Sequence, residues 1–402
     1  MRVSLICDRR TYLSIMAERL CHDTGADRLG FIPPSRASSL YSTFVKALRK
    51  IGYTVVFDRL DCDAAVVFTD EFEAERLREY RERGVPLIAF YAYTTLLSYV
   101  CFRGFDRTVW EREKRKLECL LRSCGALLIG SYSQIGDLQQ IFHDLGALVD
   151  ARDVRLIYQF CDEDIYRPDT EYNRALRARH GFREDDIVFM YHGSFHPVLG
   201  LEHFIEGVRA SGNRRVRFVL IGTGKRFREE AAPSYCARGL KENLVTMAGH
   251  DERILFLDWN HPPVNARYLN MADFYVSHLS NNIKTQNFSR LGTFQAIGCG
   301  IPVVCANTLG AHYFIRDGFN GVILPPHSSE AVTEFLNGVD RDCAARLRRN
   351  MRAVIADEPW YFFKANAQTI RNVFEGAAGG KRREGAGPLR GPLDAAEKAW
   401  TT

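Results

Sequence analysis

Short apolar runs alternate with longer amphipathic segments along the first third of the chain, and glycine or proline often stands between them. The run at 3–6 predicts a buried strand, and the segment 39–52 places apolar residues on one helical face with Gly52 at its end. The same alternation recurs to residue 129. Further strands are expected at 53–57, 64–68, 86–91 and 126–129, and further helices at 71–83 and 108–123.

A second series of the same kind begins near Ile187. Strands are expected at 187–191, 217–221, 254–257, 274–277 and 302–305, with helices at 201–210, before Ala272 and up to Ile297. The segment 157–172 separates the two series, and we interpret it as a linker. Two such series predict two doubly wound α/β domains with parallel sheets. Ligands bind beyond the carboxyl ends of such strands, so we expect a binding cleft between the domains.

The expected boundaries place an N-terminal domain at 1–165 and a C-terminal domain at 166–357. A last helix at 358–376 should return to the N-terminal domain, with Trp360, Phe363 and Phe374 as its packing residues. These aromatic residues could also suggest a stacking surface for nucleic acid. We favour packing, and no nucleic-acid partner is expected. The tail 377–402 is rich in glycine, alanine and arginine, and we expect it to be disordered.

The composition is that of a globular protein, with 46% hydrophobic residues among 402 and a formal net charge of +5. The mild basicity favours an anionic ligand only weakly, and nucleotides, phospholipid surfaces and nucleic acid all fit it. Eleven scattered cysteines without a Cys-x-x-Cys pair argue for reduced thiols. The charged start and the lack of a long apolar run predict a cytoplasmic protein.

Some sequence features suggest other functions. The acidic runs 61–63 and 162–164, and the pair His192 and His196, resemble parts of metal sites. Each lacks the remaining ligands, so no metal cofactor is expected. The basic amphipathic segment 110–122 could make peripheral contact with an anionic membrane. We favour a surface helix with ion pairs such as Glu111–Arg115.

Four blocks of the second half, at 192–208, 217–230, 254–276 and 295–326, resemble glycosyltransferase family 4, the retaining GT-B enzymes. The last of them, QAIGCGIPVVCANTLGAHYFIRDGFNGVILPP, keeps the family spacing throughout. The segments 129–142 and 155–169 occupy the places of further family motifs. The resemblance implies a GT-B fold, in which two Rossmann-like domains face each other across a cleft.

The resemblance also implies a transfer reaction. A nucleoside diphosphate sugar would bind the C-terminal domain, and a small-molecule, lipid or glycan acceptor would bind the N-terminal domain. Backbone N–H groups at glycine turns and nearby cations suit a diphosphate. The candidate donor residues are Gly193, Ser194, His196, Gly222, Gly224, Lys225, Arg226, Lys284, Asn287, Phe288, Ser289, Arg290 and Gln295. The candidate acceptor residues are Asp70, Tyr91 and Tyr93.

Several positions depart from the family pattern. Ser194 and Leu199 stand where the family has an arginine and a lysine facing the phosphates, and Asn287 and Gln295 stand where it has two glutamates. The family's N-terminal-domain histidine is also missing. Because cations stabilise a departing diphosphate, two interpretations stay open. Either Lys225, Lys284 or Arg290 has taken over the phosphate contacts, or the protein has kept the fold without the chemistry. In the second case it would be a binding subunit or the partner of another glycosyltransferase.

Overall fold

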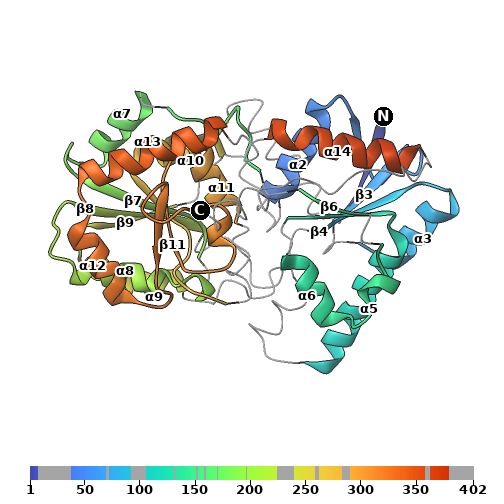
Figure 1. The fold of residues 1–402 in the computed structure, drawn as a ribbon, viewed down its shortest axis with the longest axis horizontal. Helices are drawn as coiled ribbons and strands as arrows, with labels where there is room; N and C mark the ends of the chain where they lie inside the picture. The colour runs from blue at the N-terminus through green and yellow to red at the C-terminus, as the bar shows by residue number, and fades with distance from the viewer. Residues whose placement is uncertain are drawn as a thin grey trace, which may run out of the picture. The chain divides into compact units, whose positions relative to one another are not determined.

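The chain folds into two compact units, each built on its own sheet (Figure 1). Of the described residues, those up to 157 form the first unit together with 363–379, and 160–357 form the second. The computed structural model describes residues 1–7, 38–68, 72–91, 106–130, 133–150, 153–157, 160–169, 171–195, 197–223, 240–258, 262–282, 290–357 and 363–379.

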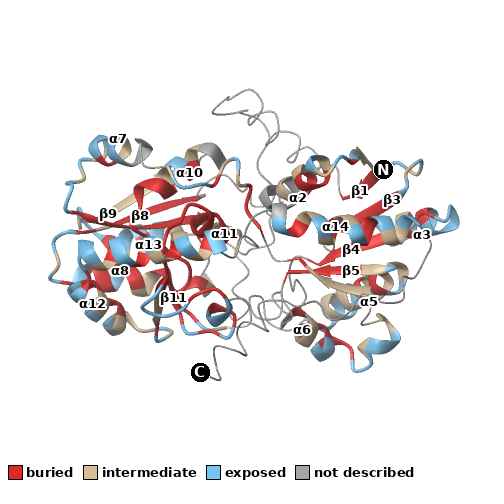
Figure 2. Ribbon diagram, turned by 45° about the horizontal axis from the view of Figure 1, so that its top comes forward, coloured by how far each residue is buried: buried red, intermediate tan, exposed pale blue. Residues whose placement is uncertain are grey.

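A six-stranded parallel sheet in the order β2-β1-β3-β4-β5-β6 forms the centre of the first unit. Its strands are β1 (Arg2–Ile6), β2 (Thr54–Phe57), β3 (Ala64–Phe68), β4 (Leu87–Tyr91), β5 (Ala126–Ile129) and β6 (Val154–Leu156). Its helices are α2 (Ser38–Lys50), α3 (Ala74–Glu82), α5 (Arg107–Ser123), α6 (Ser133–Ile141) and α14 (Phe363–Ala378). All residues of β3 and β4 are buried, as their uninterrupted apolar runs predict (Figure 2).

The last helix, α14, packs against α2, β3 and β4 of the first unit. The ring of Phe374 lies 6.5 Å from that of Phe44 and 5.9 Å from that of Tyr53, measured between centroids. These contacts place α14 in the first unit. The helix continues to Ala378, two residues beyond its expected end, while Trp360 and residues 380–402 lie outside the described residues.

Helix α5 carries the basic amphipathic segment, and its apolar face is turned into the first unit. Leu117, Leu120 and Leu121 are buried in the core. On the outer face, Arg122 pairs with Glu118 at i,i+4 spacing. Among the described residues this pair is found in place of the expected one between Glu111 and Arg115. The apolar positions that suggested membrane contact therefore serve packing. In the described part of the chain, no helix combines the length and apolar character needed to cross a bilayer.

The sheet of the second unit has the order β12-β11-β10-β7-β8-β9 and is also parallel throughout. Its strands are β7 (Ile187–Ser194), β8 (Val216–Thr223), β9 (Ile254–Asp258), β10 (Phe274–Val276), β11 (Val303–Ala306) and β12 (Gly321–Leu324). Its helices are α7 (Glu171–Arg179), α8 (Leu201–Ala210), α9 (Leu240–Ala248), α10 (Pro262–Met271), α11 (Leu291–Gly298), α12 (Ser329–Gly338) and α13 (Arg341–Asp357).

This strand order fixes where a ligand can bind in the second unit. From β7, the chain adds β8 and β9 on one side and then β10, β11 and β12 on the other. The strand order therefore reverses between β7 and β10. Loops leave these two strands in opposite directions, and the crevice between them is the usual ligand site of open α/β sheets.

Candidate functional site

The carboxyl ends of β7 and β10 are joined by the side chain of Arg290, which directly precedes α11. Arg290 Nη1 donates to the carbonyl oxygen of Ser277 at 2.5 Å, and Nη2 donates to the hydroxyl oxygen of Tyr191 at 2.9 Å. The guanidinium carbon lies 5.2 Å from the centre of the Tyr191 ring. Two hydrogen bonds and a cation–π contact thus fix a cationic group at the crevice.

Gly193, at the end of β7, lies directly against this guanidinium. Its φ of +137° is outside the range that most residues adopt. A Cβ there would lie 3.2 Å from the Tyr191 hydroxyl and 3.4 Å from Arg290 Nη2. The glycine therefore allows close approach of the cation to the strand end.

A buried polar pair, His192 and Gln295, lies beneath this surface. The Nε2 atom of His192 donates to Gln295 Oε1 at 2.7 Å, and the Tyr275 hydroxyl donates to the His192 carbonyl at 3.2 Å. His192 and Gln295 are 2% and 6% exposed. Burial lowers the pKa of His192 to about 4, against a smaller opposing effect of Gln295 and with a further lowering by the Arg290 charge. The imidazole is therefore neutral at pH 7.

We expect Gln295→Glu to raise the pKa of His192 by about 2, because a carboxylate accepting the same hydrogen bond favours the imidazolium ion. An NMR titration of the His192 ring measures this, with His192→Gln used for assignment. Gln368→Glu adds the same charge in the first unit and should leave the His192 pKa unchanged. A Gln295→Glu protein with a wild-type His192 pKa would contradict the pairing.

His278, a second buried histidine, follows β10. Its Nδ1 lies 3.1 Å from the Ser277 hydroxyl, which itself lies 2.7 Å from the Thr293 hydroxyl of α11. Burial, followed by the positive charge of Arg290, lowers the pKa of His278 to about 3. One neutral imidazole thus lies on β7 and another just after β10, the two strands whose ends Arg290 joins.

Gly222, at the end of β8, has a packing role in the described structure. A Cβ there would lie 2.3 Å from Cε2 of Phe195, which is 1% exposed. The Phe195 ring stacks on Tyr191, with centroids 5.9 Å apart. The absence of a side chain at Gly222 therefore supports the position of Tyr191, the residue that holds Arg290.

Gly222→Ala should lower the free energy of unfolding of the second unit by about 1–3 kcal/mol, because the added methyl group overlaps a buried ring. Gly212→Ala is a matched control, since the nearest atom to its Cβ would be 3.8 Å away. It should change stability by less than about 0.5 kcal/mol. Urea denaturation compares the two, and equal midpoints would refute the packing role.

The expected site residues fall into several groups. Gly193 and Gly222 lie at the carboxyl ends of β7 and β8, Arg290 directly precedes α11, and Gln295 lies on α11. Of Ser194, only the backbone is described. Tyr91, expected on the acceptor side, is buried in the core of the first unit. The remaining candidates lie outside the described residues: His196, Gly224, Lys225, Arg226, Lys284, Asn287, Phe288, Ser289, Asp70 and Tyr93.

Tyr191, Ser277 and His278 belong to the site but were not among the candidates. Each stands at the end of an apolar strand, which is the signal that would have drawn attention to them. A polar group after a buried strand is common, however. Only the strand order shows that these particular ends are neighbours.

The acidic runs considered as metal sites have other partners. Asp61 pairs with Arg2 at 2.8 Å and with Arg59 at 3.2 Å, and Asp162 accepts from the backbone N–H of Asp164. Among the described residues, no group of three or more histidine, cysteine, aspartate or glutamate side chains is placed to hold a metal ion.

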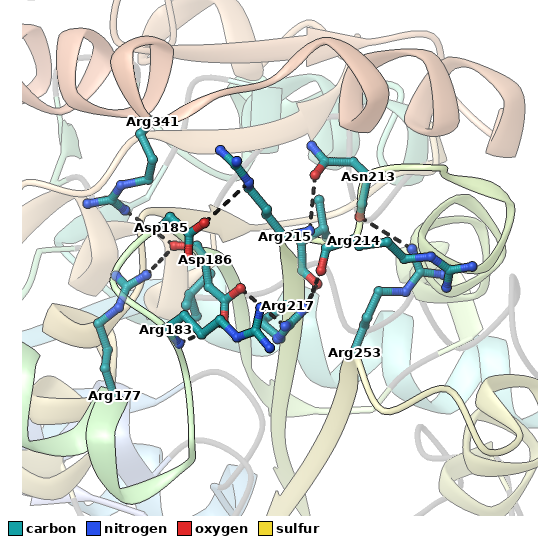
Figure 3. Close-up of polar contacts among 12 residues, drawn as sticks. Arg177, Arg183, Asp185, Asp186, Asn213, Arg214, Arg215, Arg217, Arg253 and Arg341 are labelled. Carbon is teal, nitrogen blue, oxygen red and sulfur yellow. Dashed lines mark hydrogen bonds and ion pairs between the residues drawn. The ribbon is translucent and has the colours of Figure 1, made fainter.

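An open cavity of about 340 Å³ lies at the opposite, amino-terminal edge of the second sheet. Its charged lining is balanced, with Asp185 and Asp340 beside Arg215 and Arg341. Figure 3 shows that the guanidinium groups here point to acceptors, among them Arg215 to Asp185 at 3.3 Å. We interpret this network as structural, because its charges are already paired.

The fold and the crevice define the class of this protein. It is an α/β protein of the GT-B type, and known GT-B proteins have similar structures. HepE of Anabaena, in complex with UDP-glucose, aligns with a TM-score of 0.64 at 16% identity, over 93% of this chain and 99% of that one. Sucrose-phosphate synthase from Thermosynechococcus elongatus aligns with a TM-score of 0.62 at 14% identity, over 95% and 100%.

Sequence comparison relates the second unit to glycosyltransferases. Residues 186–339 match the family described as glycosyl transferases group 1. The chain is also 26% identical over 236 residues to D-inositol 3-phosphate glycosyltransferase of Xylanimonas cellulosilytica. That match covers 58% of this chain and 52% of the relative, so it spans about half of the relative's length. The residues that match the family model include β7, β10, α11 and Arg290.

Proposed function

We propose that this protein transfers a sugar from a nucleotide-activated donor, and that the donor binds at the β7/β10 crevice. The observation that carries the proposal is the position of this crevice, where the strand order reverses within the residues that match the group 1 glycosyltransferase family. A glycine at a strand end, a fixed cation and the first turn of α11 meet there. Such a combination suits a phosphorylated ligand.

The first donor to test is a uridine diphosphate sugar. HepE of Anabaena has been crystallised with UDP, with UDP and glucose, and with UDP-glucose. The resemblance to family 4 supports a retaining reaction and an acceptor that is a small molecule, a lipid or a glycan. A donor bound to the second unit and an acceptor bound to the first would follow the family's division of roles.

The alternative is a protein with this fold that binds a partner or ligand without catalysis. Leu199 favours it, because this residue is 5% exposed within the apolar core and leaves that position without a cation. Gln295 favours it as well, since its side-chain oxygen already binds His192.

A thermal-shift panel of UDP, GDP and ADP with their sugars tests the proposal, since a ligand that binds the folded state raises the melting temperature. We expect at least one member to do so. A folded protein that none of them stabilises would refute nucleotide binding. Release of the nucleoside diphosphate in the presence of candidate acceptors then separates the enzyme from a binding subunit, and NMR of the product gives the anomeric outcome.

Transfer should continue without a divalent metal, because backbone N–H groups and a guanidinium can stabilise the diphosphate. We expect the same turnover before and after EDTA treatment. A loss of activity that added Mg²⁺ or Mn²⁺ restores would contradict this prediction.

A further inference from the structure

We propose that Arg290 is the cation that binds the diphosphate of the donor, in place of the two cations that the family resemblance puts at Ser194 and Leu199. This inference rests on the proposed function and names the residue that determines phosphate recognition at the same site. The position of the guanidinium in the fold, its anchoring and its charge each support it.

The position follows from the strand order. Tyr191 lies on β7 and Ser277 directly after β10, so a group bonded to both spans the point where the strand order reverses. Arg290 also ends the segment before α11, whose first N–H groups have no carbonyl partners within the helix. The guanidinium and the start of the helix therefore lie at one place.

Two hydrogen bonds hold the guanidinium of Arg290 in place. Both acceptors, the Ser277 carbonyl and the Tyr191 hydroxyl, are neutral oxygens. A guanidinium carries its five N–H donors in a rigid planar arrangement. Its planar fork suits bidentate binding of phosphate, and prior anchoring reduces the entropy lost when the ligand binds.

The positive charge of Arg290 affects groups on both sides of the crevice. The Arg290 cation contributes to the low pKa values of His192, on β7, and of His278, which follows β10. Both imidazoles stay neutral, and Arg290 supplies the positive charge beside Gly193. At Leu199, where the family resemblance would place a lysine, the side chain is in the core and Leu199 O accepts from Leu279 N at 2.6 Å.

Calorimetric titration with UDP and with uridine separates phosphate binding from binding of the nucleoside. We expect Arg290→Gln to weaken UDP binding roughly tenfold to a hundredfold while uridine binding is unchanged, as expected for loss of a charge-assisted hydrogen bond. Arg290→Lys should be intermediate, because it keeps the charge but loses the fork. Arg214→Gln, at the exposed amino-terminal side of β8, should bind UDP like the wild type.

Tyr191→Phe is a second test should Arg290→Gln fail to fold. It removes one anchor and keeps the charge, and it should weaken UDP binding less than Arg290→Gln while uridine binding is unchanged. Wild-type UDP affinity in a folded Arg290→Gln protein would overturn the inference, as would an equal loss of UDP and uridine binding. If the wild type binds no nucleoside diphosphate at all, the proposed function itself fails.

Discussion

Replacing Asp273 by asparagine is expected to destabilise the second unit by about 3–5 kcal/mol, because it removes the negative charge of a buried ion-pair network. Asp273 stands before β10 and is 4% exposed. Its Oδ2 accepts from both Nη atoms of Arg177, at 3.2 and 3.1 Å, and from the backbone N–H of Val188 at 2.8 Å. Its Oδ1 accepts from Arg341 at 2.6 Å.

The network joins α7, β7 and α13 to Asp273, the residue directly before β10. The side chain of Arg177 is 10% exposed and would be left beside an uncharged partner. Asp185→Asn is the matched control, because Asp185 and its partner Arg215 are 51% and 64% exposed. That change should cost less than about 1 kcal/mol. Urea denaturation of both proteins decides the matter, and similar midpoints would show that the network contributes little.

We also expect the protein to lose stability in acid because of two buried histidines. His192 and His278 have pKa values of about 4 and about 3 in the folded protein, below the ordinary value of 6.5. Between pH 6.5 and these values the unfolded chain binds protons that the folded protein does not. Stability is therefore complete above pH 6.5 and falls as the pH falls. From pH 7 to pH 5 the two groups should together cost about 4 kcal/mol.

Comparison with histidine-free variants isolates this effect from that of the carboxylates. His192→Gln and His278→Gln should each remove about half of the difference in unfolding free energy between pH 7 and pH 5, whatever their effect on stability at pH 7. His250→Gln, at an exposed position before β9, should leave the pH dependence unchanged. If neither buried histidine changes the slope, both are protonated or exposed in the folded state, contrary to the structure.

Much of the secondary structure was determined by the sequence alone. The strands at 64–68 and 126–129 and the helix at 201–210 lie where their apolar patterns predict, because a strand buried on both faces must be apolar throughout. The two series of strands and helices predicted two parallel sheets, and the block 295–326 predicted the glycosyltransferase family. These are local signals, each contained within a short stretch of chain.

The site itself was decided by the tertiary structure. Tyr191 and Arg290 are 99 residues apart, and His192 and Gln295 are 103 apart, yet both pairs are hydrogen-bonded. No periodic pattern encodes such pairings, since they depend on the strand order that brings β7 beside β10. The same holds for Gly222. Its sequence context indicated a phosphate turn, while the close contact that requires a glycine is with the ring of Phe195, the residue directly after the neighbouring strand β7.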